Sequence, residues 1–291
     1  MVAIGYTLMC EQRSPLDLVR DAVLAEQAGF DFSVISDHYH PWVEAQGHSG
    51  FAWSILGAIA QATERLPLMT YVTAPIIRYH PAVVAQMAAT VSLLAEGRFR
   101  LGLGSGEQLN EHVVGQGYPP VDVRHEMLIE AVEIIRELWE GAYVTYHGEH
   151  FDVEGAKLFD RPASPPPLGI AVSGRQSCAL AGELADLVIA TELKAELIQM
   201  FQEAGGEGKP VQNAVGERFN GRLRDECHNQ HRFLSLHDAR TVLAGWRVDD
   251  HQVRPHGALG HRTPEAVWRQ LTAEHSESLD HTTGAGQPPP L

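Results

Sequence analysis

Residues 1–211 alternate between short apolar runs and amphipathic segments, and no other feature constrains the fold as strongly. The apolar runs are rich in Val, Leu and Ile and predict buried strands, whereas the amphipathic segments have helical spacing. The strands are expected at Val2–Met9, Phe32–Ser36, Leu66–Val72, Phe99–Leu103, Leu168–Val172 and Leu187–Ala190. The helices are expected at Pro15–Ala28, Phe51–Ala62, Pro81–Leu94, Arg124–Glu140, Ser177–Leu184 and Ala195–Ala204. A hairpin is expected from two further runs, Tyr143–Tyr146 and Phe151–Val153.

Strands that alternate with helices imply parallel βαβ units. The pattern fits best an α/β fold of the (β/α)8 TIM-barrel type, truncated after about six βα units and followed by a small, mainly helical remnant. A doubly wound open sheet satisfies the same pattern. In the barrel, functional groups should lie just after the strands. An unclosed barrel should leave its first and sixth strands open or covered by the tail, and open edges favour association, up to a homodimer.

The alternation stops within the segment Glu207–Glu226. Beyond Val211 the chain carries nine arginines, no lysine and ten acidic residues, so the net charge of −15 belongs almost wholly to the part before it. An acidic surface disfavours nucleic acid as a partner, whereas the arginine-only tail hints weakly at one. We therefore expect three parts: a barrel over 1–210, a helical fragment over 211–272, in which Thr263 caps a short helix, and a disordered tail over 273–291.

The composition excludes several classes of protein. The three cysteines are scattered and lack CxxC spacing, and the histidines after Cys227 are irregularly spaced, so neither a disulfide framework nor a zinc site is expected. The N-terminus lacks a basic stretch followed by an apolar run, and no run approaches membrane-spanning length. A cytoplasmic protein is the resulting expectation.

Polar residues cluster after three of the expected strands. Ser36–Trp42 is SDHYHPW, in which His38 can act as an acid–base group that Asp37 tunes or orients; the alternative is a histidine-rich loop without function. Gly102–Glu107 is GLGSGE, where glycine can admit a flat ring close to the backbone or only form a flexible turn. Ser173–Ser177 opens a helix, which suits either an anionic group or an ordinary serine N-cap.

Together these fragments resemble the luciferase-like oxidoreductase superfamily over residues 1 to about 210. Within it they are similar to the branch that uses the deazaflavin coenzyme F420, close to F420-dependent glucose-6-phosphate dehydrogenases. The matching segments are AEQAGFD, SDHYHPW, TAPIIRYHPAVVAQ, LGLGSGEQLNEHVVG, VRHEMLIEAVEIIRELW and LADLVIATELKAELIQMFQEAGGEGKP. The resemblance implies hydride transfer between F420 and a small organic substrate, with a sugar phosphate as one candidate and FMN as the alternative cofactor. Family members continue through strands seven and eight, which this pattern lacks, so impaired activity is expected.

The resemblance also implies roles for individual residues. His38 matches the proton donor or acceptor, Glu107 its acidic partner across the substrate, and Trp42 and Glu11 match walls of the active site. Lys194 matches a residue that holds the sugar phosphate. Tyr71-Val72 matches a bulge, often a non-proline cis peptide, that backs the cofactor ring. The positions that match the cofactor site are Asp37, Tyr71, Val72, Gly106, Asn110, Val172, Ser173, Gly174, Arg175 and Gln176.

The segment from Gln212 to Leu271 resembles the C-terminal end of the integrase core of insertion-sequence transposases. NGRLRDE, RPHGALG and TPE carry this resemblance, and Gly208-Lys209-Pro210 fits both families. Glu217 matches the glutamate of a metal-binding triad, but the two aspartates belong upstream and are absent. No metal site is therefore expected, and the alternatives to an oxidoreductase are a catalytically incomplete fragment that binds DNA nonspecifically or a fusion product without function.

Overall fold

The computed structural model describes residues 3–190, 195–206 and 210–212, together with Gln252, Val253, Thr263 and Ala266. Lys194 and Glu217, both singled out from the sequence, lie outside the described residues. Contacts group Ala3–Gly221 into one compact unit, separate from the rest of the chain. In the separate part, the Ala266 N–H donates to Thr263 Oγ1 at 3.2 Å, which confirms the expected cap.

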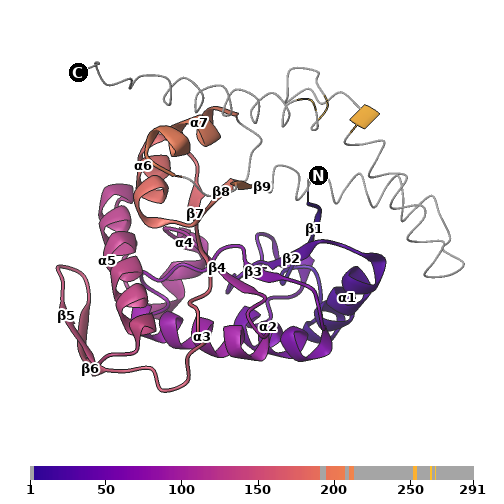
Figure 1. Ribbon diagram of the computed structural model, residues 1–291, viewed down its shortest axis with the longest axis horizontal. Coiled ribbons are helices and arrows are strands. Elements are labelled where there is room, and N and C mark those ends of the chain that lie inside the picture. The colour runs from indigo at the N-terminus through magenta and orange to yellow at the C-terminus, as the bar shows by residue number, and fades with distance from the viewer. Residues whose placement is uncertain are drawn as a thin grey trace, which may run out of the picture. The chain divides into compact units, whose positions relative to one another are not determined.

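A seven-stranded parallel sheet organises the larger unit (Figure 1). Its strands are β1 Gly5–Leu8, β2 Phe32–Ile35, β3 Leu68–Thr70, β4 Phe99–Leu103, β7 Leu168–Val172, β8 Leu187–Ala190 and β9 Pro210–Gln212. The spatial order follows the chain without reversal, and every neighbouring pair is parallel. A doubly wound sheet reverses its order at a switch point, so the incomplete barrel is confirmed and the open-sheet alternative is not.

Helices follow the strands and pack on one another in chain order along the outside of the curved sheet (Figure 1). They are α1 Pro15–Ala28, α2 Ala52–Ala62, α3 Pro81–Leu94, α4 Gln108–Glu111, α5 Val121–Glu140, α6 Arg175–Leu184 and α7 Ala195–Glu203, with short 3₁₀ turns η1 Glu44–Gln46 and η2 His112–Val114. Local chemistry sets their ends. In α1, Ser14 Oγ accepts the Asp17 N–H, Pro15 takes the first turn, and Gly29 ends the helix at φ 85°.

The two faces of the sheet bury different residues. Ile35 and Phe99 belong to the large core between strands and helices, whereas Val34, Met69 and Ile189 form a separate small cluster. Neighbouring residues of a strand point to opposite faces, so the small cluster lies on the inner side of the incomplete barrel. The strands are apolar on both faces, as expected for parallel strands of a barrel.

The expected hairpin is present between α5 and β7. Its strands are β5 Val144–His147 and β6 Asp152–Ala156, which pair antiparallel and extend beyond α5 (Figure 1). The Glu130 carboxylate of α5 accepts the N–H groups of Glu149, His150 and Phe151 at 2.8–3.1 Å. One side chain therefore holds the turn of the hairpin against the barrel.

Several boundaries differ from those expected. β3 ends at Thr70 rather than Val72, and α5 and α6 begin earlier than expected, at Val121 and Arg175. β9 was not expected as a strand. Because it pairs with β8, the sixth strand is covered rather than open.

In the part of the chain that the structure describes, every helix is too short or too polar to cross a membrane.

Candidate active site

The polar segments singled out from the sequence follow β1, β2, β3, β4 and β7. All of these strands are parallel, so their carboxyl ends lie at one edge of the sheet. Glu11, His38, Tyr71, Gly106 and Ser173 therefore occupy loops at the same edge. In barrels of this type that edge carries the active site.

The Glu11 carboxylate pairs with the His38 imidazole. Glu11 Oε1 lies 2.6 Å from His38 Nδ1; Glu11 is fully buried and the His38 side chain is 13% exposed. Ser36 Oγ donates to Glu11 Oε2 at 2.9 Å and accepts the Cys10 N–H at 3.0 Å. Burial raises the pKa of Glu11, but the contact with His38 and the hydrogen bond from Ser36 lower it more, so the pKa lies below 4.5. The two atoms form an ion pair when the imidazole is protonated.

Trp42 lies beside this pair. Its ring meets that of His38 edge to face, with centroids 5.0 Å apart and an interplanar angle of 76°. Trp42 is 43% exposed, so His38 lies between a fully buried carboxylate and a half-exposed ring. The expectation that Glu11, His38 and Trp42 gather at one place matches this geometry.

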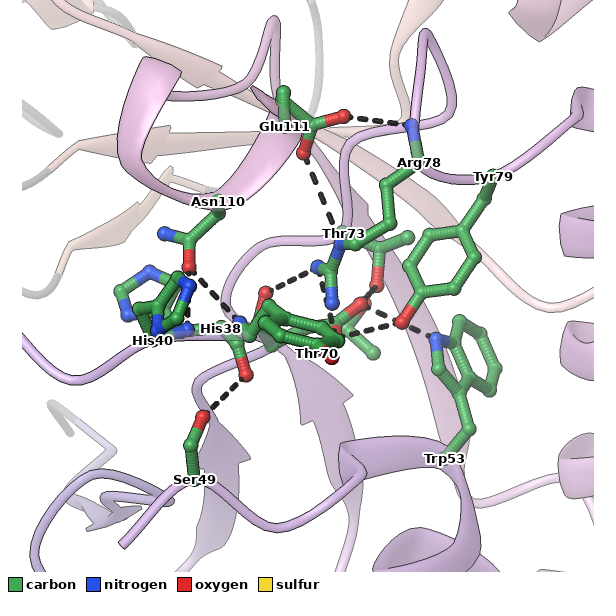
Figure 2. Close-up of polar contacts among 12 residues, drawn as sticks. His38, His40, Ser49, Trp53, Thr70, Thr73, Arg78, Tyr79, Asn110 and Glu111 are labelled. Carbon is green, nitrogen blue, oxygen red and sulfur yellow. Dashed lines mark hydrogen bonds and ion pairs between the residues drawn. The ribbon is translucent and has the colours of Figure 1, made fainter. Parts of the chain in front are cut away.

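The expected orientation of His38 by Asp37 is wrong. The Asp37 carboxylate accepts hydrogen bonds from Thr73 Oγ1 at 2.7 Å and Trp53 Nε1 at 3.3 Å, and from Tyr79 and Arg78 at 3.1 and 3.2 Å (Figure 2). Asp37 and His38 thus engage different partners, Asp37 those four donors and His38 the Glu11 carboxylate. Asp37 thus anchors the loop, and Glu11 orients the histidine.

Asn110 of α4 ties the β4 loop to the β2 loop. Its Oδ1 accepts the N–H groups of Tyr39 at 2.8 Å and His40 at 3.1 Å (Figure 2). The side chain is buried, and among the described residues its Nδ2 has no hydrogen-bond partner. A buried amide N–H without a partner is costly, which makes it a candidate donor to a ligand.

The expected cis peptide is present between Tyr71 and Val72. Tyr71 Oη donates to the Ala190 carbonyl at 3.0 Å, which joins β3 to the end of β8. A Cβ at Gly104 would lie 2.6 Å from Val72 Cγ2, and one at Gly102 would collide with the Thr70 carbonyl. Gly102 therefore admits the backbone of the neighbouring strand, and Gly104 admits the Val72 side chain; the approach of a flat ring to this turn stays a prediction.

Gly106 and Glu107 form the turn into α4. Gly106 has φ +74°, and its carbonyl accepts from Tyr118 Oη at 2.8 Å. Glu107 occupies the N-cap position with its side chain exposed and without capping α4. The structure thus places Glu107 at the correct edge of the sheet but leaves its side chain unengaged by α4.

The turn after β7 follows the buried Val172, the last residue of the strand, and leads into α6. Its N-cap is Gly174, not a serine, and Ser177 Oγ instead accepts the N–H groups of Ser173 and Gly174 at 3.0 and 3.2 Å. An ordinary serine N-cap is therefore not what this turn provides. The first turn of α6, with Arg175 and Gln176 exposed, keeps backbone N–H groups of the kind that bind anions.

Residues 4–209 match the model of the family described as Luciferase-like monooxygenase. The chain belongs to this family. Residues 199–264 also match the model described as Integrase core domain, so the two matches overlap at the junction.

Curated relatives are F420-dependent dehydrogenases. The chain is 45% identical over 194 residues to an F420-dependent glucose-6-phosphate dehydrogenase of Beutenbergia cavernae, covering 67% of this chain and 58% of the relative. It is 44% identical over 183 residues to an F420-dependent hydroxymycolic acid dehydrogenase of Mycobacterium tuberculosis, covering 63% and 51%. The chain therefore spans between half and three fifths of the length of these relatives.

The fold is similar to that of solved members. An F420-dependent secondary alcohol dehydrogenase in complex with an F420-acetone adduct aligns with a TM-score of 0.68 at 36% identity, over 72% of this chain and 68% of that one. A coenzyme F420-dependent tetrahydromethanopterin reductase from Methanopyrus kandleri aligns with a TM-score of 0.62 at 22% identity, covering 72% and 65%, and supports the fold alone.

Proposed function

We propose that residues 1–210 are a truncated F420-dependent oxidoreductase that transfers a hydride between a small hydroxyl-bearing substrate and F420. The observation that carries the proposal is the buried Glu11 carboxylate 2.6 Å from His38 Nδ1 at the carboxyl edge of the sheet. A buried acid that orients an imidazole is the arrangement that general acid–base catalysis needs. The relatives named above support F420 as the cofactor, and a sugar phosphate or a secondary alcohol as the substrate.

The residues present fit such a cofactor. The Nδ2 of Asn110, which has no partner in the described part of the chain, offers a buried donor, and the first turn of α6 offers backbone N–H groups to a phosphate. Asp37, matched to this site from the sequence, is instead committed to the loop, because its buried carboxylate is engaged by four donors. The residues that would hold the cofactor are Tyr71, Val72, Gly106, Asn110, Val172, Ser173, Gly174, Arg175 and Gln176. Bound there, F420 supplies a two-electron carrier that accepts or donates a hydride.

His38 handles the proton of the reaction. When an alcohol carbon loses its hydride, the hydroxyl must lose a proton, and His38 takes it at the ring nitrogen that does not face Glu11. Glu11 stabilises the resulting imidazolium, because its carboxylate is buried and its pKa lies below the usual value. Trp42 covers the imidazole, and Glu107 provides a second carboxylate at the same edge.

The test uses the purified full-length chain. F420 binding is followed by the fluorescence of the cofactor, and reduction by its loss of visible absorbance with glucose 6-phosphate or 2-propanol as hydride donor. FMN is titrated in parallel. Saturable binding of F420 with slow turnover would support the proposal, and binding of FMN alone would replace the cofactor. A folded chain that binds neither would refute the proposal.

A second candidate function belongs to the part after residue 210, because residues 199–264 match the integrase core model. We propose that 211–272 is a fragment of such a core and that 273–291 is a separate tail. Glu217 has no upstream aspartate partners in a matching segment, so the fragment lacks a metal triad and its arginines can only contact phosphates nonspecifically.

A further inference from the structure

A buried ion cluster lies behind the candidate active site and was not found from the sequence. The Arg78 guanidinium, in the loop between β3 and α3, contacts Asp37 Oδ1 at 3.2 Å and Glu111 Oε1 at 3.9 Å. Its side chain is 7% exposed and those of both carboxylates are 1% exposed. Burial holds the pKa of Glu111 above its ordinary value. The backbone N–H of Arg78, which donates to Glu111 Oε2 at 2.8 Å, and the Arg78 guanidinium oppose this rise. The cluster therefore joins the loops after β2, β3 and β4.

This cluster holds the main chain on either side of His38. Arg78 Nη2 donates to the Asp37 carbonyl at 2.7 Å, and Ser49 Oγ donates to the His38 carbonyl at 2.8 Å. On the following residues, Asn110 accepts the N–H groups of Tyr39 and His40. Figure 2 shows Ser49, Arg78 and Asn110 placed around the segment that carries His38 and His40. The backbone that carries the imidazole is thus held by Ser49 of the same loop, by Arg78 of the β3–α3 loop and by Asn110 of α4.

We propose that Arg78 is a positioning residue that holds His38 at Glu11 by clamping the Asp37 carbonyl against the Glu111 carboxylate. The inference rests on the function proposed above and identifies what keeps the acid–base pair at its distance. The Arg78 guanidinium contacts the loop through two acceptors of Asp37, the carbonyl and Oδ1. Glu111 in turn accepts the backbone N–H of Arg78 and lies 3.9 Å from the guanidinium Nε. The planar fork of a guanidinium supplies these fixed directions, which the single ammonium of lysine cannot.

The guanidinium also stacks on the neighbouring ring, with Arg78 Cζ 4.4 Å from the Tyr79 centroid. Tyr79 Oη donates to Asp37 Oδ1 at 3.1 Å, so the stack aligns two donors toward one carboxylate. Catalytic groups misplaced by about 1 Å can lose on the order of 10²-fold in rate. A loosened clamp should therefore lower kcat and leave the cofactor site intact.

The experiment compares Arg78→Lys with Arg98→Lys in the full-length chain. Arg98 is a matched control, because it is also a partly buried arginine whose guanidinium donates to carbonyls, those of Ala60, Thr63 and Leu66, at the other end of the strands. The direct readout, independent of turnover, is the proton NMR signal of His38 Nδ1–H in the protein without substrate, assigned by its loss in His38→Gln. The second readout is kcat and KM with F420 and glucose 6-phosphate or 2-propanol.

We expect the His38 signal to persist in the wild type and in Arg98→Lys and to be lost in Arg78→Lys. We also expect a fall of on the order of 10²-fold in kcat for Arg78→Lys, with F420 affinity within about threefold of the wild type. An unchanged signal in Arg78→Lys, or an equal loss in both variants, would overturn the positioning role. Should the wild type show the signal without turnover, the proposed function fails while the positioning role stands.

If Arg78→Lys does not fold, Glu111→Gln decides the question. It keeps an acceptor for the Arg78 N–H but removes the charge 3.9 Å from the guanidinium. A weakened or more rapidly exchanging His38 signal supports the clamp, and a signal identical to the wild type contradicts it.

Discussion

At the scale of single residues, the site depends on a carboxylate kept out of water. Glu11 is buried without an arginine or lysine at its oxygens among the described residues, so His38, Ser36 and a backbone N–H offset the cost of its charge. Replacing one partner of a buried carboxylate leaves one of its oxygens without a hydrogen bond, which is costly. This dependence ties the stability of the fold to the protonation of one side chain.

Glu11→Gln should reveal this link through pH. The pKa of folded Glu11 lies below the ordinary value of 4.5, so the charged carboxylate stabilises the fold above pH 4.5. That stabilisation is lost as the pH falls through the folded-state pKa. Chemical denaturation should therefore show a larger stability gap between wild type and Glu11→Gln at pH 7 than at pH 4. A gap that grows on acidification would contradict the assignment.

His38→Ala should separate chemistry from binding. An acid–base group acts in the transition state, so its loss should lower kcat by about 10²–10⁴-fold while the dissociation constant of F420 changes little. Steady-state kinetics and fluorescence titration give the two quantities. The role fails if the rate is unchanged, or if binding and rate are lost together.

At the scale of elements, the sequence predicted best where local chemistry acts alone. α1 and α3 begin and end at the predicted residues. A proline occupies the first turn of each helix, and Gly29 ends α1. β3 proved shorter than its apolar run and spans only Leu68–Thr70, although the Tyr71 N–H still donates to the Ile35 carbonyl of β2. β9 was missed because it begins with proline and its three residues are too few to show an alternation of apolar and polar side chains.

The site was predicted unevenly for a similar reason. His38, Trp42 and Asn110 sit in segments whose position after a strand can be inferred from the chain. Arg78 and Glu111 were missed because 33 residues separate them and each looks like an ordinary loop or helix charge. An arginine between the apolar run of Ile76 and Ile77 and a proline-led helix is the signal that could have found the first.

Gly102→Ala tests why β4 contains glycine. A Cβ there would collide with the Thr70 carbonyl of the neighbouring strand, and backbone cannot move aside as a flexible side chain can. We expect a loss of about 3 kcal/mol or failure to fold. Gly117→Ala is the control, because nothing lies within 4 Å of its added Cβ, and it should change stability by less than about 1 kcal/mol. Thermal unfolding of both variants decides; equal stability would refute the packing explanation.

Replacement of β9 tests whether the seventh strand completes the sheet. In the full chain, Pro210, Val211 and Gln212 become Gly-Ser-Gly, and the control makes the same change at His281, Thr282 and Thr283. Amide exchange over Val188–Ala190, which pair with β9, should accelerate only in the first variant, with a loss of about 2 kcal/mol in stability. Identical exchange in the two variants would show that the pairing contributes nothing.

At the scale of the whole molecule, two family matches share one chain. The luciferase-like match ends at residue 209, and the integrase match covers 199–264. The net negative charge lies almost wholly before residue 212, whereas the basic residues after it are all arginine. The barrel should therefore repel nucleic acid even where the tail attracts it.

DNA binding by the full chain should consequently be weak, independent of sequence and steeply reduced by salt. Fluorescence anisotropy with two unrelated duplexes at several salt concentrations measures this. A strand-transfer assay with magnesium or manganese should give no joined product, because Glu217 has no upstream aspartate partners in a matching segment. Joined product that disappears in Glu217→Gln would overturn this expectation.

The position of β9 also matters while the protein is being made. A ribosome releases the chain from its N-terminus, so β8 leaves before Pro210–Gln212 and for that interval presents unpaired N–H and C=O groups. Exposed strand edges on nascent chains are where aggregation begins. The edge of β8 is thus paired only after three residues that lie just beyond the end of the luciferase-like match have emerged. Completion of the sheet beyond β8 during synthesis therefore waits on the junction and not only on the enzyme-like part that precedes it.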